Sequence, residues 1–160
     1  MYRPEALMDL HERGHRSLAT LLSHCRSFTT DEIDRELPGF GNSTVRLQLH
    51  HIIGAEKYWI GVLQGRIDAD EDAPDYPTIE SLERYREQVF EATKTYLQSA
   101  SQEALNTARE MMTWGGERPV LTPARVIART VTHIYHHMGQ VAVMCRLLGR
   151  PCKGLDFPIA

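Results

Sequence analysis

The sequence predicts an all-α fold, a four-helix bundle whose helices are joined by long connections. Four segments, each of roughly 20 residues, repeat apolar side chains at the spacing of an α-helix. No comparable segment alternates apolar and polar residues as a strand does. With 160 residues, of which 42% are hydrophobic and 24% charged, the chain is long enough to bury a core as a single domain over residues 1–160.

The first two predicted helices lie on either side of a loop. The first runs from about Pro4 to Cys25 and carries leucines on one side. The sequence FTTDEIDRELPGFGNS follows and is predicted to be a loop, because it is rich in glycine, proline and capping residues. Its last residues, 42–44, supply N-cap side chains for a second helix that ends near Gln64.

The second half of the chain contains the other two predicted helices. After the acidic loop GRIDADEDAPDYP, Thr78 opens a third helix with the sequence TIESLERYREQVFEATKTYLQSA. The next segment is the least helical, and WGG at residues 114–116 indicates either a small hairpin or an irregular crossover. The pair TP at residues 122–123 starts a fourth helix, which runs to Leu148 and is stopped by GRP at residues 149–151. The long connections leave the direction of each helix open, and the tail CKGLDFPIA is predicted to be extended on the surface.

Charge and cysteine content narrow the class of protein. A formal net charge of -3, with basic residues scattered along the chain, gives no reason to expect a nucleic acid or a membrane surface as a partner. No segment reaches the roughly 18 uninterrupted apolar residues of a membrane span. The first residues, MYRPEALMDLHERGH, carry charges where a secretory leader has an apolar region. Cys25, Cys145 and Cys152 are far apart and form no C-x-x-C pair, so we expect reduced thiols in a cytoplasmic protein.

The stretch THIYHHMGQ places three histidines in the middle of the fourth predicted helix. His133 and His137 are four residues apart and face the same side of a helix, the spacing at which two imidazoles reach one metal ion. The alternative is a pair of core histidines with separate hydrogen-bond partners, since each unsatisfied polar group costs about 1–3 kcal/mol. His136 lies about 100° from His137 around the helix and is expected at the surface or in support of the ligands. A metal site therefore needs a third ligand from another helix.

The second predicted helix offers that third ligand in LQLHHIIGAEKYW. His51 shares its side of the helix with apolar residues at four-residue steps, among them Trp59, which is expected in the core. His50 lies on a more polar side, so we expect His51 to point inward and His50 outward. Glu56, five residues after His51, lies about 140° away around the helix and is a poor ligand for the same ion.

A second pair of histidines, His11 and His15, stands at the same spacing in the first predicted helix. Its neighbours in HERGHRS are charged, and the pair is judged to flank the leucine stripe of that helix. We therefore expect these two histidines to belong to a solvated face.

Two motifs resemble the signatures of the DinB-like metal-binding proteins, a family unrelated in fold to the DNA polymerase that shares the name. The first, H-x-x-x-x-E-x-x-W, is met as HIIGAEKYW at residues 51–59. The second, H-x-x-x-H-x-G-Q, is met as HIYHHMGQ at residues 133–140. The tail RLLGRPCKGLDFP is also similar to the usual end of these proteins, and the resemblance covers nearly the whole chain.

The resemblance implies a four-helix bundle, often a homodimer, in which three histidines hold one divalent metal ion, with zinc or nickel expected. Carried onto this chain, the ligands are His51, His133 and His137, the same set that helical spacing favours. Many members have another histidine one turn before the first of the pair, where this chain has Arg129. This difference leaves the three ligands intact but changes the charge of the pocket.

The resemblance further implies a metal-dependent thiol S-transferase, which activates a low-molecular-weight thiol against a small electrophile. Three protein ligands leave coordination positions for water or substrate, as in catalytic sites. In this hypothesis Arg129 holds a carboxylate of a small-molecule ligand, the thiol or the substrate, with an ordinary surface or interface ion pair as an equal alternative. Gln140 orients a ligand or donates into the pocket, and Tyr58 reaches the edge of the site.

The alternative function is a metal-binding dimer without turnover, which serves stress response, metal buffering or ligand sensing. Metal-assisted hydrolysis is a third hypothesis and needs a general base beside the ion. Glu56 is the only acid in the two motifs, and its position around the helix argues against that role.

Overall fold

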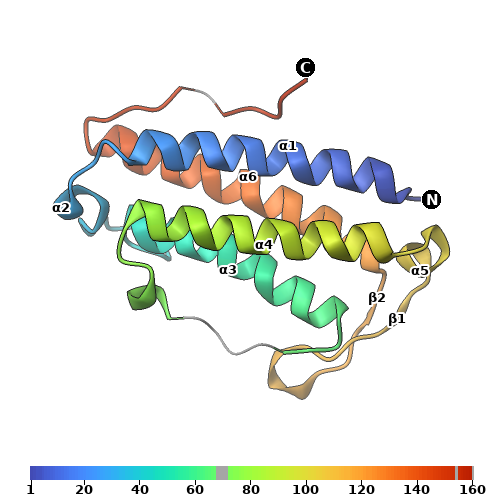
Figure 1. Cartoon of the computed structure of the whole chain (residues 1–160). Helices are drawn as coiled ribbons and strands as arrows, with labels where there is room; N and C mark the ends of the chain where they lie inside the picture. Colours follow the sequence, from blue (N-terminus) through green and yellow to red (C-terminus); the bar gives the residue numbers. More distant parts are fainter. Residues whose placement is uncertain (68–71, 154, 160) are drawn as a thin grey trace.

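The structure is a computed structural model that describes residues 1–67, 72–153 and 155–159. Four long helices, α1 (Pro4–Cys25), α3 (Val45–Leu63), α4 (Ile79–Ser99) and α6 (Pro123–Leu147), form a bundle (Figure 1). The shorter elements are α2 (Thr30–Ile33), the 3₁₀ turn η1 (Ala73–Asp75), α5 (Gln102–Asn106), β1 (Arg109–Glu110), the 3₁₀ turn η2 (Trp114–Gly116) and β2 (Val120–Leu121). The predicted all-α bundle with long connections is confirmed. Among the described residues, no helix is both long and apolar enough to cross a membrane.

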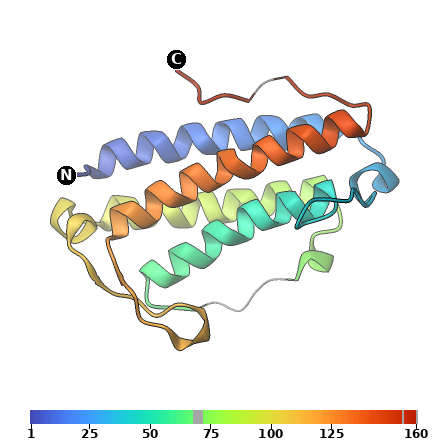
Figure 2. The same cartoon turned by 180° about the vertical axis from the view of Figure 1, so that it is seen from behind.

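The direction of the helices differs from a plain up-down-up-down bundle. α1 and α3 each contact both α4 and α6. Followed from the N-terminus to the C-terminus, α3 and α4 run one way, and α1 and α6 run the other way (Figures 1 and 2). The antiparallel neighbours are therefore α1 with α4, and α3 with α6. The second of these pairs carries the histidines of the candidate site.

Local side-chain chemistry fixes where the long helices begin, as the sequence predicted. The Thr44 hydroxyl accepts a hydrogen bond from Leu47 N at 3.1 Å, at the start of α3. Thr78 accepts one from Ser81 N at 3.2 Å, at the start of α4. Pro123 lies in the first turn of α6, where backbone N–H groups have no partner within the helix, so that the N–H that proline lacks is not missed. These contacts are short-range in sequence, and so they could be read without knowledge of the fold.

Two short helices were not predicted. The segment assigned to a loop contains α2, which begins with a capping box between Thr29 and Glu32. α5 begins at Ser101, whose side chain accepts a hydrogen bond from Ala104 N at 3.1 Å. Both helices are too short for apolar periodicity to show, so that only their caps could have revealed them.

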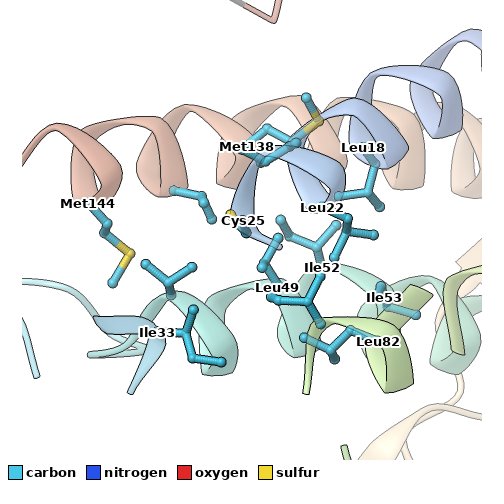
Figure 3. Packing of buried hydrophobic residues seen from close by; sticks show 14 of the residues in the cluster. Leu18, Leu22, Cys25, Ile33, Leu49, Ile52, Ile53, Leu82, Met138 and Met144 are labelled. Atoms are coloured by element: carbon cyan, nitrogen blue, oxygen red, sulfur yellow. The ribbon is translucent and has the colours of Figure 1, made fainter. Parts of the chain in front are cut away.

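Apolar side chains from all four long helices meet in the core. Figure 3 shows Leu18 and Leu22 of α1 with Ile52 of α3, Leu82 of α4 and Met138 of α6. These five side chains are at most 2% exposed. Because burying each such side chain contributes about 1.5–3 kcal/mol, the core fixes how α3 and α6 are rotated about their axes. That rotation decides which way the histidines on the two helices point.

A small antiparallel hairpin precedes α6, which is the first of the two alternatives for this segment. In it Arg109 of β1 lies opposite Leu121 of β2. The tip of the hairpin, η2, turns at Gly115 and Gly116, whose φ angles of 76° and 77° lie in the region that favours glycine. The turn brings Trp114 back toward the bundle, where it becomes part of the site described below.

The tail after α6 returns along α1, and three thiols gather where it begins. Arg13 Nη1 donates a hydrogen bond to the carbonyl oxygen of Pro158 at 2.8 Å. Cys25 and Cys145 are buried and Cys152 is half-buried, and all three are free thiols. A hydrogen bond with Cys145, together with burial, raises the pKa of the Cys25 thiol. The Cys25 thiol is therefore held protonated, whereas its hydrogen bond lowers the pKa of the Cys145 thiol.

Candidate metal centre

Three histidines from two antiparallel helices meet between α3 and α6. One nitrogen atom from each of His51, His133 and His137 lies within 4.8 Å of the others. The ring centroids are 5.0 Å apart for His51 and His133, 4.6 Å for His51 and His137, and 4.2 Å for His133 and His137. All three side chains are half-buried. This three-histidine group could hold a metal ion, since imidazole nitrogens are common ligands of zinc and nickel.

The rotation of α3 selects His51 over its neighbour. His51 faces α6, as its apolar stripe predicted. His50 faces α4, where its ring stacks on that of Tyr85 at a centroid distance of 5.6 Å. It is half-buried rather than fully exposed, so the expectation that it points outward is only partly met.

Two glutamine side chains hold His137 in place. His137 Nδ1 lies 2.8 Å from Gln140 Oε1 and donates a hydrogen bond to it in the tautomer that leaves Nε2 unprotonated. Gln48 Nε2 donates to the same oxygen at 2.7 Å, and the Gln48 amide also contacts His137 Nδ1. With Nδ1 engaged in this way, Nε2 of His137 keeps its lone pair for an ion. Gln140 was predicted in this role, whereas Gln48 was missed.

The signal for Gln48 was present in the sequence. Gln48 precedes His51 by three residues, so that the two side chains share one side of α3. Its amide stands in the apolar run of that helix and is 1% exposed. A buried amide requires hydrogen-bond partners, and its position on the ligand side of the helix indicates which partners it has.

Burial keeps the three imidazoles neutral. It lowers the pKa of His133 to about 4, with further contributions from the charges of His137, His51 and Arg129. Burial, followed by the charge of His50, lowers the pKa of His51. Burial also lowers the pKa of His137, although its hydrogen bond with Gln140 acts in the opposite direction. Neutral imidazole is the form that binds a metal ion, so no proton has to be removed near neutral pH.

The other predicted residues of α6 lie at the rim of the site. His136 is exposed, and its ring centroid is 4.7 Å from that of His137. It lies outside the three-histidine group, as expected. Arg129 is also exposed, with Cζ 5.5 Å from the ring centroid of Trp59. Among the residues that the structure describes, no carboxylate forms an ion pair with Arg129, so the expected alternative of a surface ion pair is not found.

A cavity of about 490 Å³ opens beside the histidines. It is lined by Asn42, Leu47, His50, His51, Gly54, Ala55, Lys57, Tyr58, Trp59, Asp72, Ala73, Tyr85, Trp114, Arg129 and His133. Tyr58 lies at this edge of the site, as predicted, and its hydroxyl accepts a hydrogen bond from Trp114 N at 3.0 Å. Trp59 was expected in the core but is half-buried and lines the cavity. Three histidine rings, the cations of Lys57 and Arg129 and several aromatic rings therefore face one space.

A second cluster lies deep in the bundle and corrects the prediction for α1. His11 Nε2 is 2.7 Å from Glu56 Oε1, and His15 Nε2 is 2.8 Å from Glu56 Oε2. The three residues are 0%, 2% and 2% exposed. The expectation of a solvated histidine face was wrong, because His11 and His15 continue the four-residue steps from Leu7 and lie on the apolar stripe. Glu56 points away from His51, as its position around α3 predicted.

This second group could also hold a metal ion by the distances between its ligand atoms, but hydrogen bonds already engage both oxygens of its carboxylate. Thr93 Oγ1 donates to Glu56 Oε1 at 2.6 Å, so that the carboxylate accepts from three donors. Arg86 Nη1 donates to His15 Nδ1 at 3.5 Å, which places the proton of His15 on Nε2, facing Glu56. Burial alone would raise the pKa of Glu56, but the charges and hydrogen bonds of His15 and His11 hold it below its usual range. The cluster is therefore a buried carboxylate whose two oxygens accept hydrogen bonds from three side chains.

The fold and the first site together define a four-helix bundle protein with a three-histidine group that could hold a metal ion. The chain belongs to the DinB family, whose sequence model matches residues 1–160. The family assignment that the two motifs implied is thereby confirmed.

Individual relatives agree with this assignment. The chain is 27% identical over 129 residues to the protein YizA of Bacillus subtilis (strain 168), a match that covers 78% of this chain and 76% of YizA. Its fold is similar to that of a DinB-like protein from Bacillus cereus ATCC 10987, with a TM-score of 0.68, 17% identity and coverage of 94% and 93% of the two chains. A conserved protein from Enterococcus faecalis has a TM-score of 0.67 and 17% identity, covering 92% of this chain and 98% of its own.

Proposed function

We propose that the protein binds one divalent metal ion, zinc or nickel, through His51, His133 and His137. The observation that carries this proposal is the convergence of three neutral imidazoles, with ligand nitrogens within 4.8 Å of one another, two of which, His51 and His133, line a cavity. Core histidines that only pack would each need their own hydrogen-bond partners. Three imidazoles that share one centre are explained more simply by a common cation.

We further propose that the bound ion serves a thiol S-transferase reaction. When bound, such an ion lowers the pKa of a thiol beside it, which makes the sulfur a stronger nucleophile at neutral pH. The thiol sulfur then forms a bond to an electrophilic carbon, a halide leaves or an epoxide opens, and the thiol proton passes to solvent or to the opened oxygen. The cavity supports this proposal, because it offers room for two small reactants next to the histidines.

The side chains around the cavity have separate tasks in this reaction. Arg129 binds a carboxylate of the thiol or of the electrophile. Gln140 and Gln48 keep the His137 ring in one orientation. Tyr58 fixes the hairpin tip at the edge of the cavity through its contact with Trp114 N. His136 stays exposed at the rim of the site.

Metal binding without turnover is the second candidate function, in which the protein serves a stress response as a homodimer. It is favoured by the absence of any carboxylate from the three-histidine group, which leaves no acidic general base there among the described residues. Val143 and Leu147, 43% and 62% exposed near the end of α6, offer apolar surface for the proposed dimer. The location proposed for either function is the cytoplasm.

Elemental analysis of untagged protein tests the metal site. Wild type is expected to carry about one equivalent of zinc or nickel, and His137→Ala is expected to lose it. His136→Ala is the matched control, since it removes the neighbouring exposed imidazole and should leave the metal content unchanged. A wild type that takes up no metal after reconstitution would return these histidines to the core and end the proposal.

A conjugation assay then separates the two functions. Metal-loaded wild type is mixed with glutathione or cysteine and 1-chloro-2,4-dinitrobenzene, whose thioether product absorbs light. Under the transferase proposal the rate exceeds that of His137→Ala at equal protein concentration. Equal rates across a panel of thiols and electrophiles would favour metal binding without turnover.

A further inference from the structure

We propose that the cavity beside the three-histidine group binds aryl carboxylates, small molecules that join a flat aromatic ring to a carboxylate. The inference rests on the proposed function insofar as the metal ion lies at one wall of this cavity. The ring and charge recognition, however, comes from side chains that are not proposed ligands. They belong to three separate elements, α3, α6 and the hairpin tip.

Three aromatic rings form one wall of the cavity. Tyr58 lies between Trp59, at a centroid distance of 5.1 Å, and Trp114, at 4.5 Å. All three rings line the cavity. Trp114 is 53% exposed, so that a large apolar ring faces open space where a flat ligand could cover it. Aromatic rings prefer to pack against other rings in stacked or edge-to-face arrangements, which selects flat ligands over aliphatic ones.

The hairpin tip is built to present its ring at this wall. Trp114 N donates to the Tyr58 hydroxyl at 3.0 Å. Gly115 and Gly116, with φ angles of 76° and 77°, turn the chain immediately after the ring. Thr113 N donates to the Glu117 carbonyl oxygen at 2.8 Å and closes the turn. The exposed ring is thus held in position by its own backbone.

Arg129 supplies the positive charge that would bind the carboxylate of the ligand. Its guanidinium lies over the Trp59 ring, with 5.5 Å between Cζ and the ring centroid. It forms no ion pair with any carboxylate in the described part of the chain. A guanidinium packed on a ring keeps its in-plane N–H donors available for a carboxylate. Because Arg129 stands one turn before His133, this cation and the proposed metal ion lie at the same end of the cavity.

The other charged residues of the cavity, Lys57 and Asp72, do not change the direction in which a ligand would place its carboxylate. Lys57 and Asp72 also line the cavity and carry opposite signs. Lys57 Nζ lies 5.8 Å from the ring centroid of Tyr85, on the side of α4. A ligand would therefore direct its carboxylate to Arg129 and its ring along Tyr58 and Trp114. The volume of about 490 Å³ falls within the range of small-molecule sites and admits a two-ring compound.

Calorimetry on metal-loaded protein with three matched compounds tests the proposal. The probes are 2-naphthoate, decahydro-2-naphthoate, which is saturated, and 2-(aminomethyl)naphthalene, which carries the opposite charge. The expected order of affinity places 2-naphthoate first, with each of the other two weaker by about tenfold or more. Equal binding of the amine, or of the saturated acid, would overturn the inference.

Two variants and a control locate the binding within the cavity. Arg129→Gln is expected to weaken 2-naphthoate by about tenfold, and Trp114→Ala by about fivefold. Arg125→Gln is the control, because Arg125 is an exposed arginine one turn earlier on α6 that does not line the cavity. If Arg129→Gln and Arg125→Gln have the same effect, the carboxylate is not held by Arg129.

The metal content of the same samples separates two kinds of failure. Protein that retains its metal but does not bind 2-naphthoate overturns this inference and leaves the metal site standing. Protein that never takes up metal contradicts the proposed function, whatever the naphthoate result. Thermal unfolding of each variant confirms that it is folded, and a conservative Trp114→Phe variant should regain most of the affinity that Trp114→Ala loses.

Discussion

The molecule contains two histidine clusters built on the same plan, each close enough in its ligand atoms to hold a metal ion, and the two differ in their third residue and in their burial. Each combines a pair of histidines four residues apart on one helix with a third residue from α3. In the first cluster α6 supplies the pair and His51 completes it. In the second cluster α1 supplies the pair and Glu56 completes it. The comparison shows what a histidine pair alone cannot decide.

The third residue makes the difference. His51 is neutral, so the first cluster consists of three lone-pair donors and attracts a cation. Glu56 is an anion, and its two oxygens already accept hydrogen bonds from His11, His15 and Thr93. The first cluster is half-buried beside a cavity, whereas the second is almost completely buried. Neutral imidazoles beside a cavity can bind a metal ion. A buried carboxylate that already accepts hydrogen bonds stabilises the fold instead.

The largest expected effect is on metal affinity. Replacing a proposed ligand, His133→Ala, should weaken metal binding by more than about 100-fold, since loss of even an outer hydrogen-bond partner costs 10–100-fold in known sites. Competition with a chromogenic chelator measures this affinity. Glu56→Gln should leave both affinity and stoichiometry unchanged in the folded protein. Weaker metal binding in Glu56→Gln than in His133→Ala would reverse the roles of the two clusters.

The second effect is on stability. Here Glu56→Gln is expected to have a larger effect than His133→Ala, the reverse of the order for metal binding. Glu56→Gln removes a buried charge and sets an amide N–H against the N–H of His15, which should lower the free energy of unfolding by about 3 kcal/mol. Urea unfolding of metal-free protein gives this value. His133→Ala should cost less, because its side chain is half-buried and lies at a cavity. A loss below about 1 kcal/mol for Glu56→Gln would mean that the second cluster contributes little.

A smaller effect is expected from Gln48, whose role the sequence analysis missed. Gln48→Ala removes the amide that supports Gln140 and His137 and should weaken metal binding by about tenfold. Gln88→Ala, an exposed glutamine on α4, is a suitable control. If both variants bind metal like wild type, the orientation of His137 is set by Gln140 and packing alone.

The last prediction concerns pH in the metal-free protein. The pKa of His15 lies below 6.5 in the folded state, chiefly because of burial, so the unfolded chain takes up its proton first as the pH falls. Stability is therefore full above pH 6.5 and decreases as the pH falls below that value. His15→Gln should show a shallower decrease than wild type in unfolding experiments over this range. A steeper decrease in His15→Gln than in wild type would contradict the sign.

The contrast between the two clusters also explains how far sequence reasoning could go. The caps at Thr44 and Thr78 are local, and so the helix starts were predictable. His51 was preferred over His50 because a stripe of apolar residues records which side of a helix is buried. Such periodicity is a property of one helix and requires no knowledge of its neighbours.

Partners that come from different helices were not predictable in the same way. His11 and His15 were misread because their charged sequence neighbours suggested solvent, while the carboxylate that satisfies them lies 45 and 41 residues away. The contact between Gln48 and Gln140 spans 92 residues. The antiparallel packing of α3 with α6 joins Gln48 to Gln140, and the packing of the four helices brings His11 and His15 of α1 to Glu56 of α3. The sequence can indicate that a buried polar residue needs a hydrogen-bond partner, but the tertiary packing determines which residue that partner is.

The most direct test of this account is the location of zinc by anomalous diffraction from crystals of the wild-type protein grown with the metal. We predict one strong anomalous peak, between His51, His133 and His137, and no peak at Glu56. A peak between His11, His15 and Glu56 would show that a carboxylate does not close such a cluster to metal. A crystal with no peak at the three histidines would contradict the central claim that they form the metal centre.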